Sequence, residues 1–209
     1  MTSPLPATDG APSRANRRRA KRIDDILRIA TSLLAERGYA ATNLDEIAEA
    51  LDLSKASLYH YFPSKEDLIL ACLDRIGDET NRQLRTVVAS PLSPRNRLRA
   101  AVRAQVLVLT RDQPAGAALY LRDVGLPETA RERLRTFVEQ HDQLFRSIIE
   151  EGIQAGDLHV VDLTVARLLM HGAINFIPSW YKQNRRMSPE RLADVVADTL
   201  LQIFGGGAS

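Results

Sequence analysis

The sequence predicts an all-α protein in which a small three-helix unit is joined to a larger helical domain. Apolar residues recur three and four positions apart in almost every segment, which is the period of a helix with one buried face. Pro, Gly and polar capping residues separate these segments, and no alternation typical of a strand persists for more than a few residues. The 209 residues, 44% of them hydrophobic, suffice for two packed cores.

The first 19 residues are expected to form a disordered basic arm. Residues 1–13 contain three Pro, one Gly and small polar side chains. A run of basic residues without an acid among them follows within nine positions: Arg14, Arg17, Arg18, Arg19, Lys21 and Arg22. Such a run is usually a solvated tail, although next to a nucleic acid it would cross phosphates or enter the minor groove.

The next segment predicts a helix that ends at Gly38, a residue type that often terminates helices. Its core face consists of Ile23, Ile26, Leu27, Ala30, Leu33 and Leu34. A short second helix follows, which Thr42 and Asn43 can cap and which has acidic residues in its first turn. The apolar stripe of this second helix is Leu44, Ile47, Ala48 and Leu51.

Asp52 and Leu53 interrupt that stripe, and Ser54 can cap a third helix from Lys55 to about Tyr61. Pro63 stops it, and Ser64 can cap a long fourth helix that extends to about residue 89. In the third helix Leu58 faces the core, as does Phe62 just beyond it. The polar and aromatic side chains that remain are Lys55, Ser57, Tyr59, His60 and Tyr61.

These outward-facing side chains are not typical of a surface that only faces water. They are suited to contacting base edges and phosphates in a major groove. Two amphipathic helices around a turn also occur in proteins that never bind DNA, so the pattern alone leaves both interpretations open. Net charge does not decide between them, because residues 1–80 hold 11 Lys and Arg against 13 Asp and Glu. Affinity for DNA would have to depend on a few placed groups.

Over residues 20–80 the chain resembles the DNA-binding domain of TetR-family transcriptional regulators. The resemblance lies in the helix IDDILRIATSLLAERGY, in the Gly38-Tyr39 turn before Thr42, and in the IAEALDLS helix and turn. The most specific element is SLYHYFPSKEDLI. The resemblance implies a homodimeric regulator, expected to be a repressor, that binds a palindromic double-stranded DNA operator. The expected DNA-binding residues are Arg18, Arg19, Thr42, Asn43, Lys55, Ala56, Ser57, Tyr59, His60, Tyr61 and Lys65.

Residues 81–209 are expected to form the larger, effector-binding and dimerisation domain. Its helices are predicted at 94–111, 114–123, 127–155, 162–183 and 188–204. The last two each carry an apolar stripe, which could cover the core of a monomer. In the resembling family the last two helices pair with their twins in a four-helix bundle. On that basis the expected dimer interface comprises Leu168, Gly172, Phe176, Leu192, Val196 and Leu200.

Family members commonly release DNA when a small molecule enters a cavity of this domain. The candidate lining residues are Val106, Leu109, Tyr120, Phe137, His141, Phe145, Asn175 and Trp180, and packing in a core explains each of them equally well. The segment GAINFIPSWYKQNRRMSPERLADVVADTLLQ is similar to that of members sensing acyl-CoA thioesters. Four basic groups near Trp180 could hold coenzyme A phosphates or could be a solvated helix end: Arg122, Lys182, Arg185 and Arg186.

Other functions find little support in the sequence. The four His show no metal-ligand spacing, and the chain lacks GxSxG, a phosphate-binding glycine loop and CxxC, so neither an enzyme, a metal site nor a cofactor is expected. Cys72 is the only cysteine and is expected to be a buried apolar residue rather than a redox sensor. No apolar run of membrane-spanning length occurs, which favours a cytoplasmic protein. A helical interaction module and a ligand-independent DNA-binding protein remain as alternatives.

Overall fold

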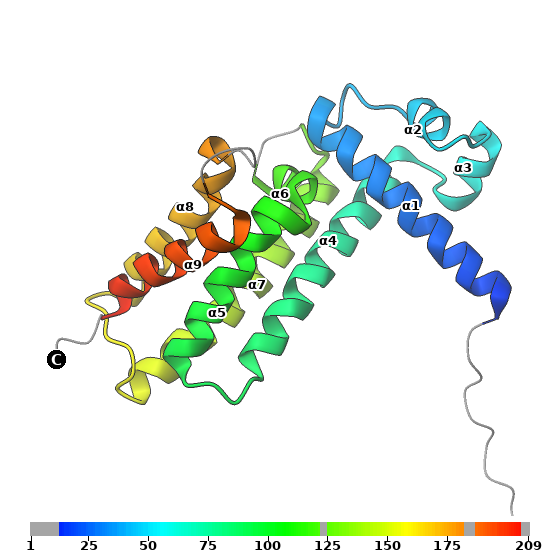
Figure 1. Ribbon diagram of the computed structural model, residues 1–209. Helices are drawn as coiled ribbons and strands as arrows, with labels where there is room; N and C mark the ends of the chain where they lie inside the picture. Colours follow the sequence, from blue (N-terminus) through cyan, green and yellow to red (C-terminus); the bar gives the residue numbers. More distant parts are fainter. Residues whose placement is uncertain (1–12, 122–124, 182–186, 206–209) are drawn as a thin grey trace, which may run out of the picture.

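The computed structural model describes residues 13–121, 125–181 and 187–205, and within these ranges the regular structure is entirely helical (Figure 1). The α-helices are α1 Arg14–Arg37, α2 Leu44–Ala50, α3 Lys55–Tyr61, α4 Lys65–Val88, α5 Pro94–Leu107, α6 Pro114–Leu121, α7 Glu128–Gln154, α8 Leu163–Trp180 and α9 Pro189–Leu200. A π-helical stretch, η1 (Val108–Asp112), follows α5, and a 3₁₀ turn, η2 (Leu201–Phe204), follows α9. The predicted all-α class is confirmed.

The predicted disorder of residues 14–19 is wrong, because α1 already begins at Arg14. The Ser13 hydroxyl caps this helix by accepting from the Asn16 N–H at 3.2 Å, and arginine is a good helix former. The first turns of α1, which carry the basic run, form a basic rod of helix. This rod projects beyond the rest of the molecule (Figure 1). Residues 1–12, also predicted to be disordered, lie outside the described residues.

The small unit has its own core, in which apolar faces of α1, α2, α3 and the first half of α4 meet. Ile26, Ile47, Leu58 and Ile69 are each 0% exposed. Leu119 of α6 and Ala130 of α7 join the same cluster. The small unit is therefore packed against two helices of the larger domain and is not simply tethered to it.

The larger core is formed by α5, α7, α8 and α9 with the second half of α4. Leu84 of α4 belongs to this core, whereas Leu68 and Leu73 of the same helix belong to the small one. Helix α4 thus crosses from one core to the other. It packs along α7 for much of its length, while α5 packs along α9.

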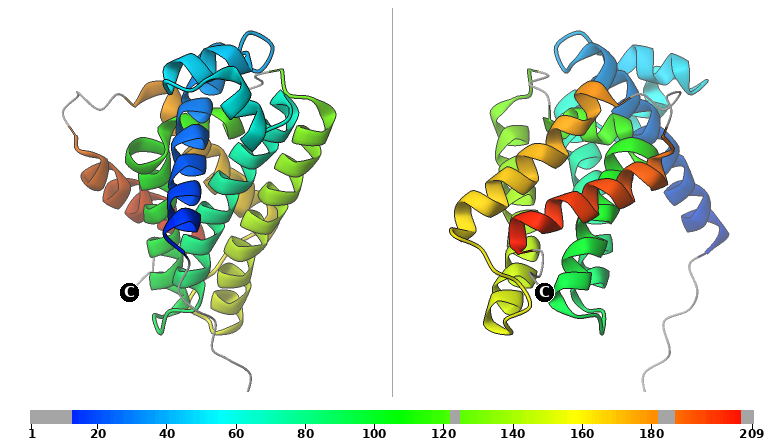
Figure 2. Two further views of the ribbon diagram at one scale, coloured as in Figure 1. Left: turned by 90° about the vertical axis from the view of Figure 1, so that its right-hand side faces the viewer. Right: turned by 60° about the vertical axis from the view of Figure 1, so that its left-hand side comes forward.

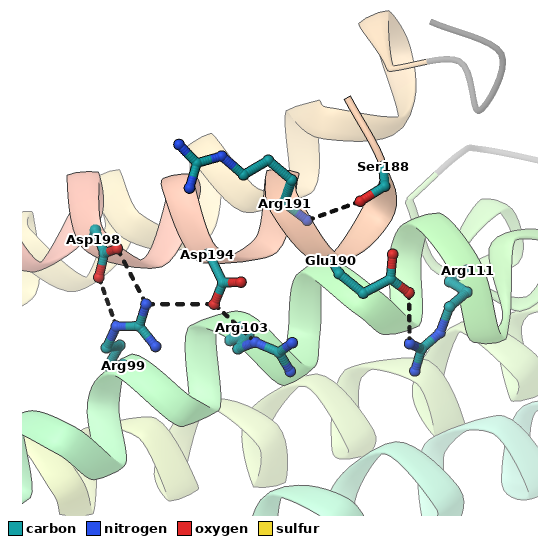
Figure 3. A network of polar contacts seen from close by, with 8 residues as sticks. All are labelled: Arg99, Arg103, Arg111, Ser188, Glu190, Arg191, Asp194 and Asp198. Carbon is teal, nitrogen blue, oxygen red and sulfur yellow. Dashed lines mark hydrogen bonds and ion pairs between the residues drawn. The ribbon is translucent and has the colours of Figure 1, made fainter. Parts of the chain in front are cut away.

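A row of ion pairs fastens α9 to α5 and η1 (Figure 3). Arg99 Nε lies 2.6 Å from Asp198, and Arg103 Nε lies 3.0 Å from Asp194. Arg111 reaches Glu190 at 2.9 Å. These charges are partly exposed, so each pair adds little stability alone. The row lies along the side of α9 that faces α5 and η1.

The expected dimer stripe of α9 is wrong for two of its residues. Leu192 and Leu200 are 4% and 7% exposed and belong to the core of their own protomer. Helix α8 instead has the uncovered apolar face, since Leu168 and Phe176 are 58% and 65% exposed. In Figure 1, α8 and α9 lie on the side of the molecule away from α2 and α3. The right-hand view of Figure 2 shows that side.

Within the described residues, no helix combines the length and the apolar character that crossing a membrane requires. They also contain no group of three or more His, Cys, Asp or Glu side chains placed to hold a metal ion.

Candidate nucleic-acid interface

Helix α2 is fixed at its start by a reciprocal cap. The Asn43 side chain accepts from the Glu46 N–H at 2.8 Å, and the Glu46 carboxylate accepts from the Asn43 N–H at 3.5 Å. Leu44 and Ile47 then lie in the core. Asn43 is therefore positioned at the exposed N-terminus of α2, where backbone N–H groups also favour a phosphate.

The turn between α2 and α3 is tight because Asp52 adopts a left-handed conformation, with φ of 51°. The Leu53 N–H then donates back to the Ala48 carbonyl at 2.9 Å. Ser54 caps α3 by accepting from the Ser57 N–H at 3.2 Å. The start of α3 is thus fixed, and the predicted helix-turn-helix is formed by local signals in the sequence.

Core contacts fix how α3 is rotated. Leu58 is fully buried and Phe62 is 8% exposed, so the opposite side of α3 must face solvent. On that side Lys55, Ala56, Tyr59 and His60 are exposed. Ser57 and Tyr61 are half-buried at its edges, and the Ser57 hydroxyl is hydrogen-bonded to Ser54 at 2.7 Å. The six α3 candidates therefore lie around the part of α3 that the core does not cover.

Lys55 is held over this face by a neighbouring helix. Its ammonium donates to the Asp45 carboxylate of α2 at 2.7 Å, and this hydrogen bond raises the pKa of Lys55. The ammonium also lies 5.9 Å from the centre of the Tyr59 ring. A DNA phosphate near Lys55 would compete with Asp45 for the same donor.

Lys65, at the start of α4, is supported by the turn after α1. Its ammonium lies 4.2 Å from the centre of the Tyr39 ring and donates to the Ala40 carbonyl at 3.5 Å. Partial burial lowers the pKa of Lys65 from its usual value. The importance of Tyr39 as a support for Lys65 was not predicted, although the Gly38-Tyr39 turn was noted.

Thr42 does not fit its predicted role in binding the DNA backbone. It is 1% exposed, and its hydroxyl donates to the Gly38 carbonyl at 2.9 Å. Its role in this structure is to close the connection between α1 and α2. The sequence pattern showed a capping residue at this position but did not show that the loop folds over it.

The basic turns of α1 and the end of α3 line one shallow cleft of about 760 Å³. The Arg19 guanidinium lies 5.4 Å from the centre of the Tyr61 ring. The cleft is lined by Ala15, Asn16, Arg18, Arg19, Lys21, Arg22, Asp25 and Tyr61. The predicted arm residues Arg18 and Arg19 are therefore contiguous with the α3 face, and Asn16 joins them as a polar residue that the sequence did not single out.

The predicted effector-binding residues fall into three groups, of which the half-buried Tyr120 and His141 are one. Val106, Leu109, Phe137 and Phe145 are buried core residues, between 0% and 7% exposed. Asn175 and Trp180 are exposed on α8, so the prediction that they line an internal cavity of the protomer is wrong. None of the eight residues lines the cleft between α1 and α3, and none lines a second cleft, of about 1040 Å³, which residues of α1, α4, η1 and α6 form. Arg122 and residues 182–186 lie outside the described residues.

Tyr120, Phe137 and His141 lie together along the seam between α4 and α7. The Tyr120 hydroxyl donates to the Leu73 carbonyl at 3.0 Å, and burial raises the pKa of Tyr120. A Cβ atom at Gly77 of α4 would lie 2.5 Å from Phe137, so the two helices approach closely there. His141 Nδ1 lies 3.0 Å from Asn81 Oδ1. Asn81 was not predicted, because nothing in the helical period marks it as a partner of His141.

Cys72 is fully buried in the small core, as expected. Its thiol lies 3.7 Å from the Leu27 carbonyl, and burial raises the pKa of Cys72 to about 11. A thiol of this kind holds little thiolate at neutral pH and behaves as an apolar side chain.

Comparison with known proteins agrees with this geometry. Residues 26–72 match the profile of "Bacterial regulatory proteins, tetR family", and residues 91–204 match "Tetracyclin repressor-like, C-terminal domain". The transcriptional repressor KstR2 of Rhodococcus jostii is 28% identical over 206 residues, which cover 97% of this chain and 96% of that protein. The transcriptional activator FasR of Mycolicibacterium smegmatis is 34% identical over 127 residues, 58% of each chain.

A solved structure extends the likeness to three dimensions. The crystal structure of AibR in complex with isovaleryl coenzyme A and operator DNA superposes with a TM-score of 0.75 and 28% identity. The superposition covers 88% of this chain and 97% of AibR. With the second profile alone spanning more than half of the chain, this protein belongs to the tetR family of bacterial regulatory proteins.

Proposed function

We propose that the protein is a homodimeric cytoplasmic repressor that binds a palindromic operator and leaves it when an acyl-CoA thioester binds the larger domain. Membership of the tetR family establishes a transcriptional regulator that is not an enzyme. The observation that carries the finer proposal is the cleft in which Tyr61 of α3 meets Arg18 and Arg19 of α1. It joins a helix suited to the major groove with cations suited to the adjoining phosphates.

In this proposal Lys55, Ala56, Ser57 and Tyr59 approach base edges or nearby phosphates. Asn43, His60, Tyr61 and Lys65 bind the DNA backbone. The α1 rod follows the phosphates beside α3, or enters the adjoining minor groove, through Arg18 and Arg19. Tyrosine and serine distinguish bases only loosely, so the contacts define a docking geometry rather than an operator sequence.

A dimer follows from the need for two such faces and from the apolar surface of α8. One short recognition helix contacts few base edges, and two-fold symmetry doubles the site on a palindrome. The exposed side of α8 carries Leu168 and Phe176, with Gly172 between them and nothing within 4 Å of a Cβ built there. A second copy could therefore approach α8 closely.

The acyl-CoA part of the proposal is supported by the relatives. AibR was crystallised with isovaleryl coenzyme A and operator DNA. KstR2 of Rhodococcus jostii matches this chain over nearly its full length and is a repressor. The physical link is α4, which has Leu68 in one core and Leu84 in the other. An effector can change DNA affinity only if it binds more tightly to one arrangement of α4 than to a second arrangement.

Fluorescence anisotropy tests this function with duplexes from the region upstream of the gene and with scrambled duplexes of equal length. We expect one duplex to bind with two protomers per site, and isovaleryl-CoA to lower the affinity. Equal affinity for upstream and scrambled duplexes would refute the proposal that the protein binds a specific operator. A reporter placed behind the bound site distinguishes repression from activation.

A further inference from the structure

The interior of the larger domain contains a polar pair that the fold does not fully satisfy. Asn81 of α4 is 1% exposed, and its Oδ1 lies 3.0 Å from Nδ1 of His141 on α7. This hydrogen bond uses one nitrogen of the imidazole and one atom of the amide. Asn81 Nδ2 and His141 Nε2 are both buried without a hydrogen-bond partner among the described residues.

The imidazole of His141 is neutral at physiological pH. Burial, and then the nearby His171, lowers the pKa of His141 to about 4. A neutral imidazole has one donor and one acceptor nitrogen. If Nδ1 donates to the amide oxygen, Nε2 is left as an acceptor and the amide nitrogen as a donor. If the amide is turned over, the roles exchange, and one donor and one acceptor are again left free.

Neighbouring groups do not supply a free charge to this pair. Asp142 lies 3.3 Å from His171 Nε2 and also pairs with Arg167 of α8. The His141 ring packs 5.2 Å from the ring of Phe145, measured between centroids. The two unpartnered atoms therefore lie near the Phe145 ring and near a second imidazole, that of His171, 6.2 Å away between ring centroids. The Nε2 atom of His171 is also buried, and its nearest charged group is Asp142, which already pairs with Arg167.

We propose that Asn81 and His141 form the recognition point for an uncharged amide or hydroxyl group of the effector, an inference that rests on the proposed effector-controlled function. In this proposal one effector group meets both the free donor and the free acceptor, so it both accepts and donates. Amides and hydroxyls do so, whereas a carboxylate only accepts and an acyl chain does neither. The pantetheine arm of a coenzyme A thioester contains such groups.

The position of Asn81 connects this recognition point to the DNA-binding unit. Gly77 and Leu73 lie one and two turns before Asn81 on α4, and both face α6 and α7 through Tyr120 and Phe137. The seam is closely packed at Gly77, so in this proposal a ligand that hydrogen-bonds to Asn81 alters the packing of α4 on α7. The packed and the ligand-bound arrangements therefore differ in the contacts of α4, which carries the helix-turn-helix at its start.

The test removes both polar partners with apolar groups of similar shape, in the double variant Asn81→Leu, His141→Phe. Apolar replacement of both partners is close to neutral or stabilising where the polar atoms are unsatisfied. We therefore expect Tm to stay unchanged or to rise by about 2–4 °C. Operator affinity without effector should stay within about twofold, while the isovaleryl-CoA concentration needed for release should rise by more than about tenfold, about the loss of 1.4 kcal/mol.

The matched control is Ser147→Ala on α7, whose hydroxyl donates to the Leu144 carbonyl of its own helix at 2.8 Å. This variant should respond to isovaleryl-CoA as the wild type does. A double variant that loses stability, as it would if an ordered water completed the pair, and still responds like the wild type would overturn the proposal.

Histidine ring ¹⁵N NMR gives a second readout that does not depend on the effector class. The probes are isovaleryl-CoA and N-methylacetamide, a minimal amide, with isovalerate as the carboxylate control. We expect the His141 nitrogens to shift with either amide-bearing probe but not with isovalerate, while the exposed His159 stays unchanged. Unmoved His141 nitrogens would refute the recognition point, whereas failure of operator binding in the wild type would refute the proposed function instead.

Discussion

The Lys65 ammonium lies 4.2 Å from the centre of the Tyr39 ring, so a cation at the start of α4 is supported by the turn that ends α1. The Ala40 carbonyl accepts from the same ammonium at 3.5 Å. These contacts already restrict the rotamers of the Lys65 side chain, so less conformational entropy is lost when it binds a phosphate. A preorganised phosphate contact is the expected consequence.

Replacing Lys65 with Ala should weaken binding to all DNA sequences alike. The slope of log affinity against log salt concentration should fall in magnitude by about 0.9 per half-site, because one counterion fewer is released. Titrations by anisotropy at several salt concentrations measure this slope. Lys65→Arg, which keeps the charge, is the control, and an unchanged slope in Lys65→Ala would show that Lys65 does not touch a phosphate.

The double variant Arg18→Ala, Arg19→Ala tests the basic rod of α1. It should lower affinity for operator and scrambled DNA, and the salt slope should decrease by about 1.8 per half-site. Arg146→Ala on α7, an exposed arginine paired with Glu150 at 2.7 Å, should leave both quantities unchanged. A loss of affinity confined to the specific duplex would point to base contacts in place of phosphate contacts.

The variant Phe176→Glu tests whether α8 forms the dimer interface. A charge at a buried apolar contact should raise the dimer dissociation constant by about 100-fold or more, measured by sedimentation velocity. The matched control is Val138→Glu on α7, where the native side chain is also exposed, at 51%, but is distant in sequence from α8. Dissociation by both variants, or by Val138→Glu alone, would place the interface elsewhere.

The pH dependence of stability should report on His141. Folding lowers the pKa of this histidine from 6.5 to about 4, so between these values the unfolded chain binds the extra proton. Stability therefore rises with pH across that window and is lost as pH falls. From pH 7 to pH 5 the free energy of unfolding should decrease by about 2 kcal/mol from this group.

Urea denaturation at the two pH values measures that decrease. The variant His141→Gln should show a smaller decrease than the wild type, and His159→Gln, at an exposed histidine, should show the wild-type decrease. His171 shifts in the same direction, with burial again the first cause, so part of the dependence should remain in His141→Gln. Equal pH dependence in all three proteins would contradict the assignment.

The sequence by itself determined the helical class, the helix-turn-helix and most helix ends, because these depend on local chemistry. Ser54 and Ser64 cap the helices that follow them, and the left-handed Asp52 makes the turn where the apolar stripe was interrupted. Tertiary structure alone decided which helix faces are covered. The period of α9 showed an apolar stripe but could not show that Leu192 faces its own core, because a stripe is the same whichever surface covers it.

The same reason explains the other corrections. Burial of Thr42 depends on the path of the loop after α1, and exposure of Trp180 depends on which side of α8 meets the core. The pairing of Asn81 with His141 joins residues 60 positions apart, a separation over which the sequence shows no signal. Capping hydrogen bonds and hydrophobic periodicity involve residues that are close in sequence and can therefore be predicted from it. The partners of a buried side chain are distant in sequence and are decided only when the helices pack.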